Sequence, residues 1–396
     1  MKIALVHVKF TYASKLSYLD DWLDAFISRP ELEVDLINIA TEDSVLVRQI
    51  QDKIEKVPYI IVHHSVFGDS LQYIQRYVQA FKYRRGKMLC FVGNEVNLPI
   101  LGMKPKLTLL KQIKPQIIAT QLLQAAGEWL YADCTSTVLS IPHALNPKVF
   151  SAKKTYEKRL VDVGTRSHRY SPHLGDDERN RLLEYFANTV PNKFHLRCNV
   201  DTSTRFNREG WAAFLNQCKA TIATEVGSFY LQKDDALVDE INYFFLKNSK
   251  KPILEERSFL RAMARGLLPK FIKNKIKQYL IIPEDLEKNA DFKVIYHQII
   301  KKHLPCPEYS KTISSRHFDA IGTKTLQILT PGRYADILKP YEHYFPLTKN
   351  FSNIEEIIDS LKDKAIYTRV TEAAYEHVIS NHTYQHRIDQ VIEALG

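Results

Sequence analysis

Short apolar runs alternate with amphipathic segments along the first 140 residues of the chain. The runs predict strands at Lys2–Val8, Glu33–Ile39, Tyr59–His63, Lys87–Val92, Gln116–Ala119 and Thr137–Ile141. The segments between them have helical spacing at Ser17–Ile27, Ser44–Ile54, Leu71–Arg84, Leu107–Gln112 and Leu122–Leu130. Continuous apolar runs of this length are typical of parallel strands that are buried on both faces. The pattern therefore predicts a doubly wound Rossmann-like domain over residues 1–146.

A second region of alternating strands and helices follows a linker that contains Pro142 and Pro147. Its predicted strands are Leu160–Gly164, Phe194–Cys198 and Thr221–Thr224, with a further strand from about Thr325, and its predicted helices include Asp176–Ala187 and Arg208–Gln217. Residues 229–311 are mostly of helical pattern and predict an insertion. The fold class is thus α/β: two Rossmann-like parallel-sheet domains facing a cleft, at residues 1–146 and 147–364. We expect helices over residues 365–396 that pack back on the first domain.

Composition narrows the class of protein only a little. The chain has 396 residues, of which 45% are hydrophobic and 25% charged, as in ordinary globular proteins. No apolar run reaches the roughly 18 residues that a membrane-spanning helix needs. The five cysteines form no C-x-x-C pair, which favours reduced thiols in a cytosolic protein. The net charge of +10 favours a polyanionic neighbour, such as nucleic acid, anionic lipid or a phosphorylated ligand.

Several polar residues directly follow the predicted strands of the first domain, where ligands bind in such folds. His63 and His64 are candidates for a general base or for binding hydroxyl groups, and Glu95 is a comparable catalytic candidate. The alternative is that these residues are packed, solvated or capping a helix. Further candidates for the acceptor side of the cleft are Lys9, Asn94 and His143. No G-x-G-x-x-G pattern follows the first strand, so a dinucleotide-dependent dehydrogenase is disfavoured.

A short helix is predicted from about Ser314 to Gly322, which we expect to end the helix in the left-handed conformation. Arg316 lies in its first turn, where the helix dipole disfavours a cation. That position becomes favourable if an anion binds at the same helix N-terminus. Asp319 lies three residues further on and so shares a face with Arg316. The face offers donors for phosphate and a carboxylate for sugar hydroxyls, although a surface Arg–Asp pair is the alternative.

This segment, Arg316-x-Phe318-Asp319-Ala320-x-Gly322-Thr323, resembles the Arg-x-Phe-Glu-Ala-x-x-x-Gly-Thr region of glycosyltransferases related to the spore-maturation CgeB group, in the glycosyltransferase group 1 family. The linker Pro-His-Ala-Leu-Asn-Pro-x-Val-Phe at residues 142–150 resembles the interdomain crossover of the same proteins, which have the GT-B fold. The resemblance implies that Asp319 holds the nucleotide ribose and that the helix start at Ser315 meets the donor diphosphate. The chain departs from the family pattern at Asp319, where Glu is usual, and at Lys311, where many retaining relatives have a second Glu.

The resemblance implies a glycosyltransferase that moves a sugar from a nucleotide-diphosphate donor to a saccharide or glycolipid acceptor, in bacterial surface polysaccharide or lipopolysaccharide synthesis. It implies no obligatory cofactor and no metal. The donor-binding residues expected on this basis are Gly164, Arg166, Glu225, Gly227, Ser315, Arg316, Asp319 and Thr323. The alternatives are another GT-B nucleotide-sugar enzyme, such as an epimerase, and a non-catalytic membrane-associated nucleotide-binding protein.

The segment Arg257–Lys277 carries seven cations and no acidic residue, with apolar residues near helical spacing. A basic amphipathic segment of this kind favours docking on an anionic membrane surface. The alternative is a solvated basic face over an ordinary core contact. Nucleic-acid binding is disfavoured, because no aromatic residues for base stacking are interleaved on that face. We therefore expect a cytoplasmic protein that is peripheral at the inner face of the cell membrane.

Overall fold

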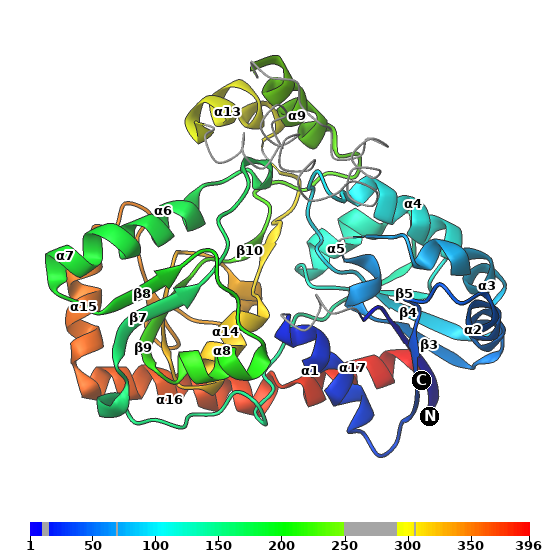
Figure 1. Ribbon diagram of the computed structural model, residues 1–396, viewed down its shortest axis with the longest axis horizontal. Helices are drawn as coiled ribbons and strands as arrows, with labels where there is room; N and C mark the ends of the chain where they lie inside the picture. The colour runs from blue at the N-terminus through cyan, green and yellow to red at the C-terminus, as the bar shows by residue number, and fades with distance from the viewer. Residues whose placement is uncertain (10–15, 69, 249–290, 305) are drawn as a thin grey trace, which may run out of the picture.

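The structure is a computed structural model that describes residues 1–9, 16–68, 70–248, 291–304 and 306–396. Two parallel β-sheets form the centres of two α/β domains that stand side by side (Figure 1). The predicted fold class of two Rossmann-like parallel-sheet domains is confirmed. The basic segment Arg257–Lys277 lies outside the described residues.

The first sheet has six parallel strands in the order β2-β1-β3-β4-β5-β6. The strands are β1 (Lys2–His7), β2 (Glu33–Asn38), β3 (Tyr59–Val62), β4 (Lys87–Phe91), β5 (Ile117–Thr120) and β6 (Thr137–Ser140). The helices around them are α1 (Ser17–Ile27), α2 (Ser44–Lys56), α3 (Val78–Tyr83), α4 (Met103–Ile113) and α5 (Gln124–Tyr131). Along β1, Ala4 and Val6 pack in one core cluster while Ile3 and Leu5 pack in another. Both faces of the sheet are therefore buried, as the unbroken apolar runs predict.

The second sheet has five parallel strands in the order β13-β12-β9-β7-β8. The strands are β7 (Val161–Arg166), β8 (Cys198–Asp201), β9 (Cys218–Ala223), β12 (Leu326–Leu329) and β13 (Phe345–Pro346). The helices of this domain include α6 (Glu178–Glu184), α7 (Val190–Phe194), α8 (Arg208–Leu215), α14 (Ser315–Gly322), α15 (Ile354–Lys362) and α16 (Lys364–Asn381). The carboxyl ends of β7 and β8 lead into loops that face the first domain, which places this edge of the sheet at a candidate binding site.

The two C-terminal helices pack on different domains. Helix α16 contributes Ala374 and Val378 to the core of the second domain. Helix α17 (Tyr384–Leu395) contributes Ile388 and Val391 to the first-domain core cluster that contains Trp22. Figure 1 shows the two helices running one after the other beneath both domains. Only the last helix therefore returns to the first domain, while the first part of residues 365–396 belongs to the second-domain core.

The insertion makes further links between the domains. Its base is a pair of short antiparallel strands, β10 (Val226–Gly227) and β11 (Lys311–Thr312). Helices α9 (Ala236–Asn248) and α13 (Phe292–Gln298) pack together above them (Figure 1). The Thr312 hydroxyl donates to the Gln121 carbonyl at 2.7 Å. The Asp235 carboxylate accepts from the backbone N–H groups of Met103 and Lys104 at 2.8 and 2.9 Å, and so caps α4 of the first domain.

Helix α14 ends differently from the prediction. Gly322 is the last helical residue, and Lys324, with φ of 51°, adopts the left-handed conformation instead. A Cβ atom at Gly322 would lie 2.4 Å from the Phe150 carbonyl oxygen and 2.5 Å from Leu145 Cδ1. Glycine is therefore needed for close packing against the interdomain linker, and the predicted left-handed cap at Gly322 is wrong.

Among the described residues, none of the helices combines the length and the apolar character needed to cross a membrane.

Candidate active site

A cavity of about 430 Å³ lies between the two domains and is lined by residues of both. On the first domain its wall comes from the start of α1 with the residue before it, and from the residues after β4, β5 and β6. On the second domain it comes from the loops after β7 and β8, from β10 and from the start of α14. Most of these residues follow the carboxyl ends of parallel strands, where ligands bind in open α/β sheets. We call this space the interdomain cavity.

The start of α14 forms part of the cavity wall through Ser314, Ser315 and Arg316. The Ser314 N–H donates to His317 Nδ1 at 3.1 Å, which fixes the N-cap. Burial lowers the pKa of His317 to about 3, so the imidazole is neutral and able to accept this bond. The first N–H groups of a helix have no partner within it, and the helix dipole is positive at this end. The wall therefore has the properties of an anion site.

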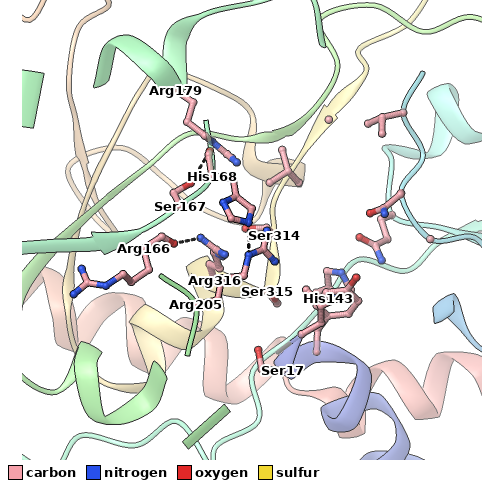
Figure 2. Close-up of a pocket in the computed structure, with 18 of the residues that line it drawn as sticks. Ser17, His143, Arg166, Ser167, His168, Arg179, Arg205, Ser314, Ser315 and Arg316 are labelled. Carbon is pink, nitrogen blue, oxygen red and sulfur yellow. Dashed lines mark hydrogen bonds between the residues drawn. The ribbon is translucent and has the colours of Figure 1, made fainter. Parts of the chain in front are cut away.

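Three arginines from three different elements surround this helix start (Figure 2). They are Arg316 on α14, Arg179 on α6 and Arg205 in the loop after β8. The Arg316 guanidinium donates to the Arg166 carbonyl. Burial, together with the charges of Arg179 and Arg205, lowers the pKa of Arg316 to about 10. The cluster therefore holds positive charge that a bound anion stabilises.

Arg179 and Arg205 are held in place by neighbouring groups. The Arg179 guanidinium lies 3.8 Å from the centre of the Tyr170 ring, and its Nε donates to the Thr224 hydroxyl at 3.2 Å. Arg205 Nε lies 2.5 Å from His168 Nε2, while His168 Nδ1 lies 3.0 Å from the Thr202 carbonyl. These partners assign the proton of His168 to Nδ1. Desolvation and the three arginines also lower the pKa of His168, so this residue orients Arg205 as a neutral imidazole.

The Arg166 side chain is directed away from the cluster (Figure 2). Its guanidinium donates to the carbonyl and the Oδ1 atom of Asn199 at 3.0 and 2.9 Å. It also lies 4.2 Å from the centre of the Phe214 ring. The Arg166 carbonyl accepts from the Arg316 guanidinium. Arg166 lines the cavity, and its role in donor binding stays a prediction.

Asp319 lies one layer behind the cavity wall. Its Oδ2 accepts from Trp211 Nε1 at 3.0 Å, and the Trp211 ring itself lines the cavity. Its Oδ1 is buried without a hydrogen-bond partner among the described residues. Burial raises the pKa of this carboxyl well above its usual value. The ribose role of Asp319 stays a prediction, because the carboxyl does not line the cavity.

The other predicted donor-site residues divide between wall and core. Gly227 lines the cavity with φ of 107°, and a Cβ there would lie 2.6 Å from the Ser310 carbonyl oxygen. The Glu225 carboxylate is 4% exposed and accepts from the Tyr334 N–H at 2.7 Å and from the Tyr309 hydroxyl. Gly164 packs against Cys218 and Phe214, and Thr323 bonds the carbonyls at the far end of α14. Of these four residues, only Gly227 reaches the cavity.

The three predicted catalytic residues of the first domain lie outside the cavity lining. Glu95 accepts from the hydroxyls of Thr120 and Tyr131 at 2.5 and 2.6 Å and from the Gln121 N–H at 2.8 Å. It thereby fixes the turn that presents Gln121 to the cavity. His63 and His64 are each 1% exposed, and burial lowers the pKa of both imidazoles. Their catalytic role stays a prediction, because none of the three side chains lines the cavity.

Two of the three predicted acceptor-side residues line the cavity. Asn94 does so from a left-handed turn after β4, with φ of 48°. His143 does so from the linker, and its Nδ1 accepts from Trp22 Nε1 at 3.2 Å. Lys9 is exposed instead, with its Nζ 3.5 Å from Asp20 Oδ1.

Sequence reasoning did not identify Arg179, Arg205, His168 or Trp211. Arg179 could have been found from the sequence, because it lies in the first turn of α6. A cation is unfavourable in that turn, and this was the argument that identified Arg316. Arg205 and His168 lie in irregular loops where no local pattern marks them. Only the tertiary structure brings them together.

Residues 295–393 match a family described as "Glycosyl transferase-like". The structure is similar to that of HepE from Anabaena in complex with UDP-glucose, with a TM-score of 0.50, 10% sequence identity and coverage of 100% of this chain and 99% of that chain. It also aligns with a glycosyltransferase from Rickettsia africae, with a TM-score of 0.47, 12% identity and coverage of 100% and 97%. No protein of curated function matches the sequence.

The chain has the GT-B fold, and its residues 295–393 carry the sequence pattern of the glycosyl transferase-like family. The predicted likeness to group 1 glycosyltransferases is confirmed by the fold and by the family match over residues 295–393. The match also supports glycosyl transfer as the reaction class.

Proposed function

We propose that the protein transfers a sugar from a nucleotide-diphosphate donor to a hydroxyl group of a saccharide or glycolipid. The observation that carries the proposal is the convergence of Arg316, Arg179 and Arg205 on the start of α14, at the wall of the interdomain cavity. Guanidinium groups and helix N-termini are the groups that bind phosphate oxygens best in proteins. That HepE was crystallised with UDP-glucose supports a nucleotide sugar as the donor class.

In this proposal the diphosphate binds against Ser315 and the three arginines, and Asp319 Oδ1 accepts from a ribose hydroxyl. During transfer the bond between the anomeric carbon and the diphosphate oxygen breaks, a bond to the acceptor oxygen forms, and the proton of the acceptor hydroxyl passes to solvent. The leaving diphosphate gains negative charge in this step. Fixed cations that stabilise charge developing on a leaving group are among the strongest catalytic devices in enzymes.

The absence of an obligatory metal or cofactor stays a prediction. In the part of the chain that the structure describes, no group of three or more His, Cys, Asp or Glu side chains is arranged to hold a metal ion. The arginine cluster supplies the positive charge that the diphosphate needs at this site.

The test is a transfer assay with a panel of nucleotide sugars, each with and without acceptor glycosides, that follows release of the nucleoside diphosphate. The proposal expects release that depends on an acceptor. Donor conversion without any acceptor would favour the epimerase alternative. Failure of every nucleoside diphosphate to raise the melting temperature would remove the proposal, because a ligand of the native state must stabilise it.

We further propose that the protein works at the cytoplasmic face of an anionic membrane, in the synthesis of a bacterial surface polysaccharide or lipopolysaccharide. The support is the sequence of Arg257–Lys277, whose seven cations suit an anionic lipid surface. Co-sedimentation with phosphatidylglycerol vesicles tests it. Wild-type protein should bind at low salt, and a variant with Arg257, Arg261 and Arg265 changed to Glu should not. Equal binding of the two proteins contradicts this proposal.

A further inference from the structure

Among the described residues that line the interdomain cavity, the charged side chains all belong to the second domain. Four arginines line it on the second domain. The described first-domain lining is apolar or aromatic at Leu16, Tyr18, Val96 and Leu98, and neutral and polar at Asn94 and Gln121. None of the first-domain residues that line the cavity is Lys, Arg, Asp or Glu, within the part of the chain that the structure describes. As far as the described residues form it, the wall opposite the arginines is therefore uncharged.

His143 on this wall is also uncharged. Its Nδ1 accepts from Trp22 Nε1 at 3.2 Å, so the proton of the neutral imidazole is on Nε2. Burial lowers the pKa of this residue to about 3. Its ring centre lies 4.5 Å from that of Tyr18, which also lines the cavity. His143 therefore offers an N–H donor to this wall, and neither a cation nor a base.

Charged groups that lie just behind the wall are directed elsewhere. Lys106 Nζ donates to the carbonyls of Gly93 and Asn94, both at 2.7 Å. The Glu95 carboxylate accepts three hydrogen bonds, from the Thr120 hydroxyl at the end of β5, the Gln121 N–H and the Tyr131 hydroxyl on α5. Both charged groups are therefore hydrogen-bonded within the protein, to backbone groups or to hydroxyls that shape the wall. A ligand that meets this wall finds hydrogen-bonding groups and apolar surface without a counter-charge.

We infer that the acceptor is an uncharged sugar, bound with an apolar face against Tyr18 and Leu98 and with its hydroxyls toward Asn94, Gln121 and His143. This inference rests on the proposed function. A phosphate or carboxylate on the accepting sugar loses hydration at this wall and gains no opposite charge in return. It is attracted instead to the arginines, where it competes with the donor diphosphate. Phosphorylated sugars and uronic acids are therefore poor acceptors.

The experiment uses the full chain saturated with UDP and pairs of octyl glycosides that differ only in charge. The pairs are the glucoside and glucuronide, the galactoside and galacturonide, and the mannoside and mannuronide. Binding is measured by saturation-transfer NMR with a competition titration. In the pairs that bind, we expect the neutral member to bind at least about tenfold more tightly. We also expect salt to weaken UDP binding and to leave glycoside binding almost unchanged.

A charge added to the wall gives a second readout. Gln121→Lys should reduce the preference for the neutral member by at least about tenfold, because the ammonium supplies the missing counter-charge. Thr108→Lys adds the same charge on the exposed face of α4, outside the cavity lining, and should leave the preference unchanged.

The outcomes distinguish a failure of the proposed function from a failure of the inference about the acceptor. If neither UDP nor any other nucleoside diphosphate binds the wild-type protein, the proposed function fails. If UDP binds but the charged members bind as tightly as the neutral ones, only the inference about the acceptor is overturned. The same holds if none of the neutral glycosides binds in the presence of UDP.

Discussion

The carboxylate of Asp319 accepts a hydrogen bond from the indole Nε1 of Trp211 at 3.0 Å, and both groups are buried. This bond joins α14 to α8 directly behind the wall of the interdomain cavity. The ring of Trp211 also faces the Arg316 guanidinium, which lies 5.7 Å from its centre. The indole of Trp211 thus contacts both the Arg316 guanidinium and the Asp319 carboxylate, the two groups that we assign to donor binding.

Removal of this indole N–H should destabilise the protein. In Trp211→Phe the Asp319 carboxyl keeps its burial and loses its described partner, which typically costs about 1–3 kcal/mol for a buried polar group, in addition to lost packing. Urea denaturation followed by circular dichroism measures the change in the free energy of unfolding. Trp129→Phe is the matched control, because Trp129 is partly exposed and contacts Lys233 with its ring. Equal losses in the two variants would show that the bond to Asp319 contributes nothing.

The free energy of unfolding should decrease as the pH rises toward neutrality, because the buried carboxyl of Asp21 then loses its proton. This carboxyl on α1 accepts from Asn146 at 2.7 Å and from Arg208 at 3.2 Å, and burial raises its pKa from 3.8 to about 7. A raised carboxyl pKa gives stability that is fully present below about pH 4 and is lost as the pH rises through about 7. This rise in the pKa of Asp21 corresponds to a loss of at most about 4 kcal/mol in the free energy of unfolding.

The variant Asp21→Asn tests this prediction, because its amide oxygen still accepts from Asn146 and Arg208 and does not titrate. The difference in unfolding free energy between variant and wild type should move in favour of the variant between pH 5 and pH 8. Other groups face the same site, namely Asp24 on α1, Tyr384 on α17 and Asp319 on α14. The charge of Asp21 also raises the pKa of Asp319 and of Tyr384, so the measured difference includes this coupling. A difference that does not change with pH contradicts the assignment.

Gly322→Ala should destabilise the junction between α14 and the linker. The added Cβ would lie 2.4 Å from the Phe150 carbonyl oxygen, which is backbone and cannot rotate away. Overpacking of this kind typically costs about 1–3 kcal/mol. Gly68→Ala is the control, because the nearest atom to its Cβ would be at an ordinary 3.7 Å. Chemical denaturation of the two variants should give a clear loss for the first and a small change for the second. Similar values would mean that the linker shifts to make room.

The arrangement of the first domain could be predicted closely from the sequence, because the central strands β1, β3, β4 and β5 are buried along most of their length and leave apolar runs. The edge strands β2 and β6 are partly exposed. The second domain was less regular. The strand predicted at Phe194–Cys198 lies at Cys198–Asp201, because the preceding helix continues to Phe194 and His195 then turns with φ of 54°. Apolar residues at 194 and 196 fit either structure, so their pattern did not decide between them.

The candidate site was predictable only where a local signal existed. Arg316 was identified because a cation in a first helical turn is unfavourable without an anion. The sequence does not show whether a residue after a strand faces the cavity or the core. His64 is therefore found stacked on Phe91, with ring centres 4.4 Å apart, while His143 reaches the cavity. The convergence of Arg205 and Arg179 depends on the packing of loops that are distant in the chain.

The most direct test of the central claim is a calorimetric titration of UDP into four proteins: wild type, Arg316→Ala, Arg179→Ala and Arg181→Ala. Arg181 lies on the same helix as Arg179 but pairs with Asp177 at 3.1 Å on the exposed surface, outside the cavity lining. Loss of a charge-assisted bond to phosphate should weaken binding by more than about 1 kcal/mol in each of the first two variants. The Arg181 variant should bind like the wild type. Unchanged affinity in the Arg316 and Arg179 variants, or an equal loss in all three, would contradict a diphosphate site at the start of α14.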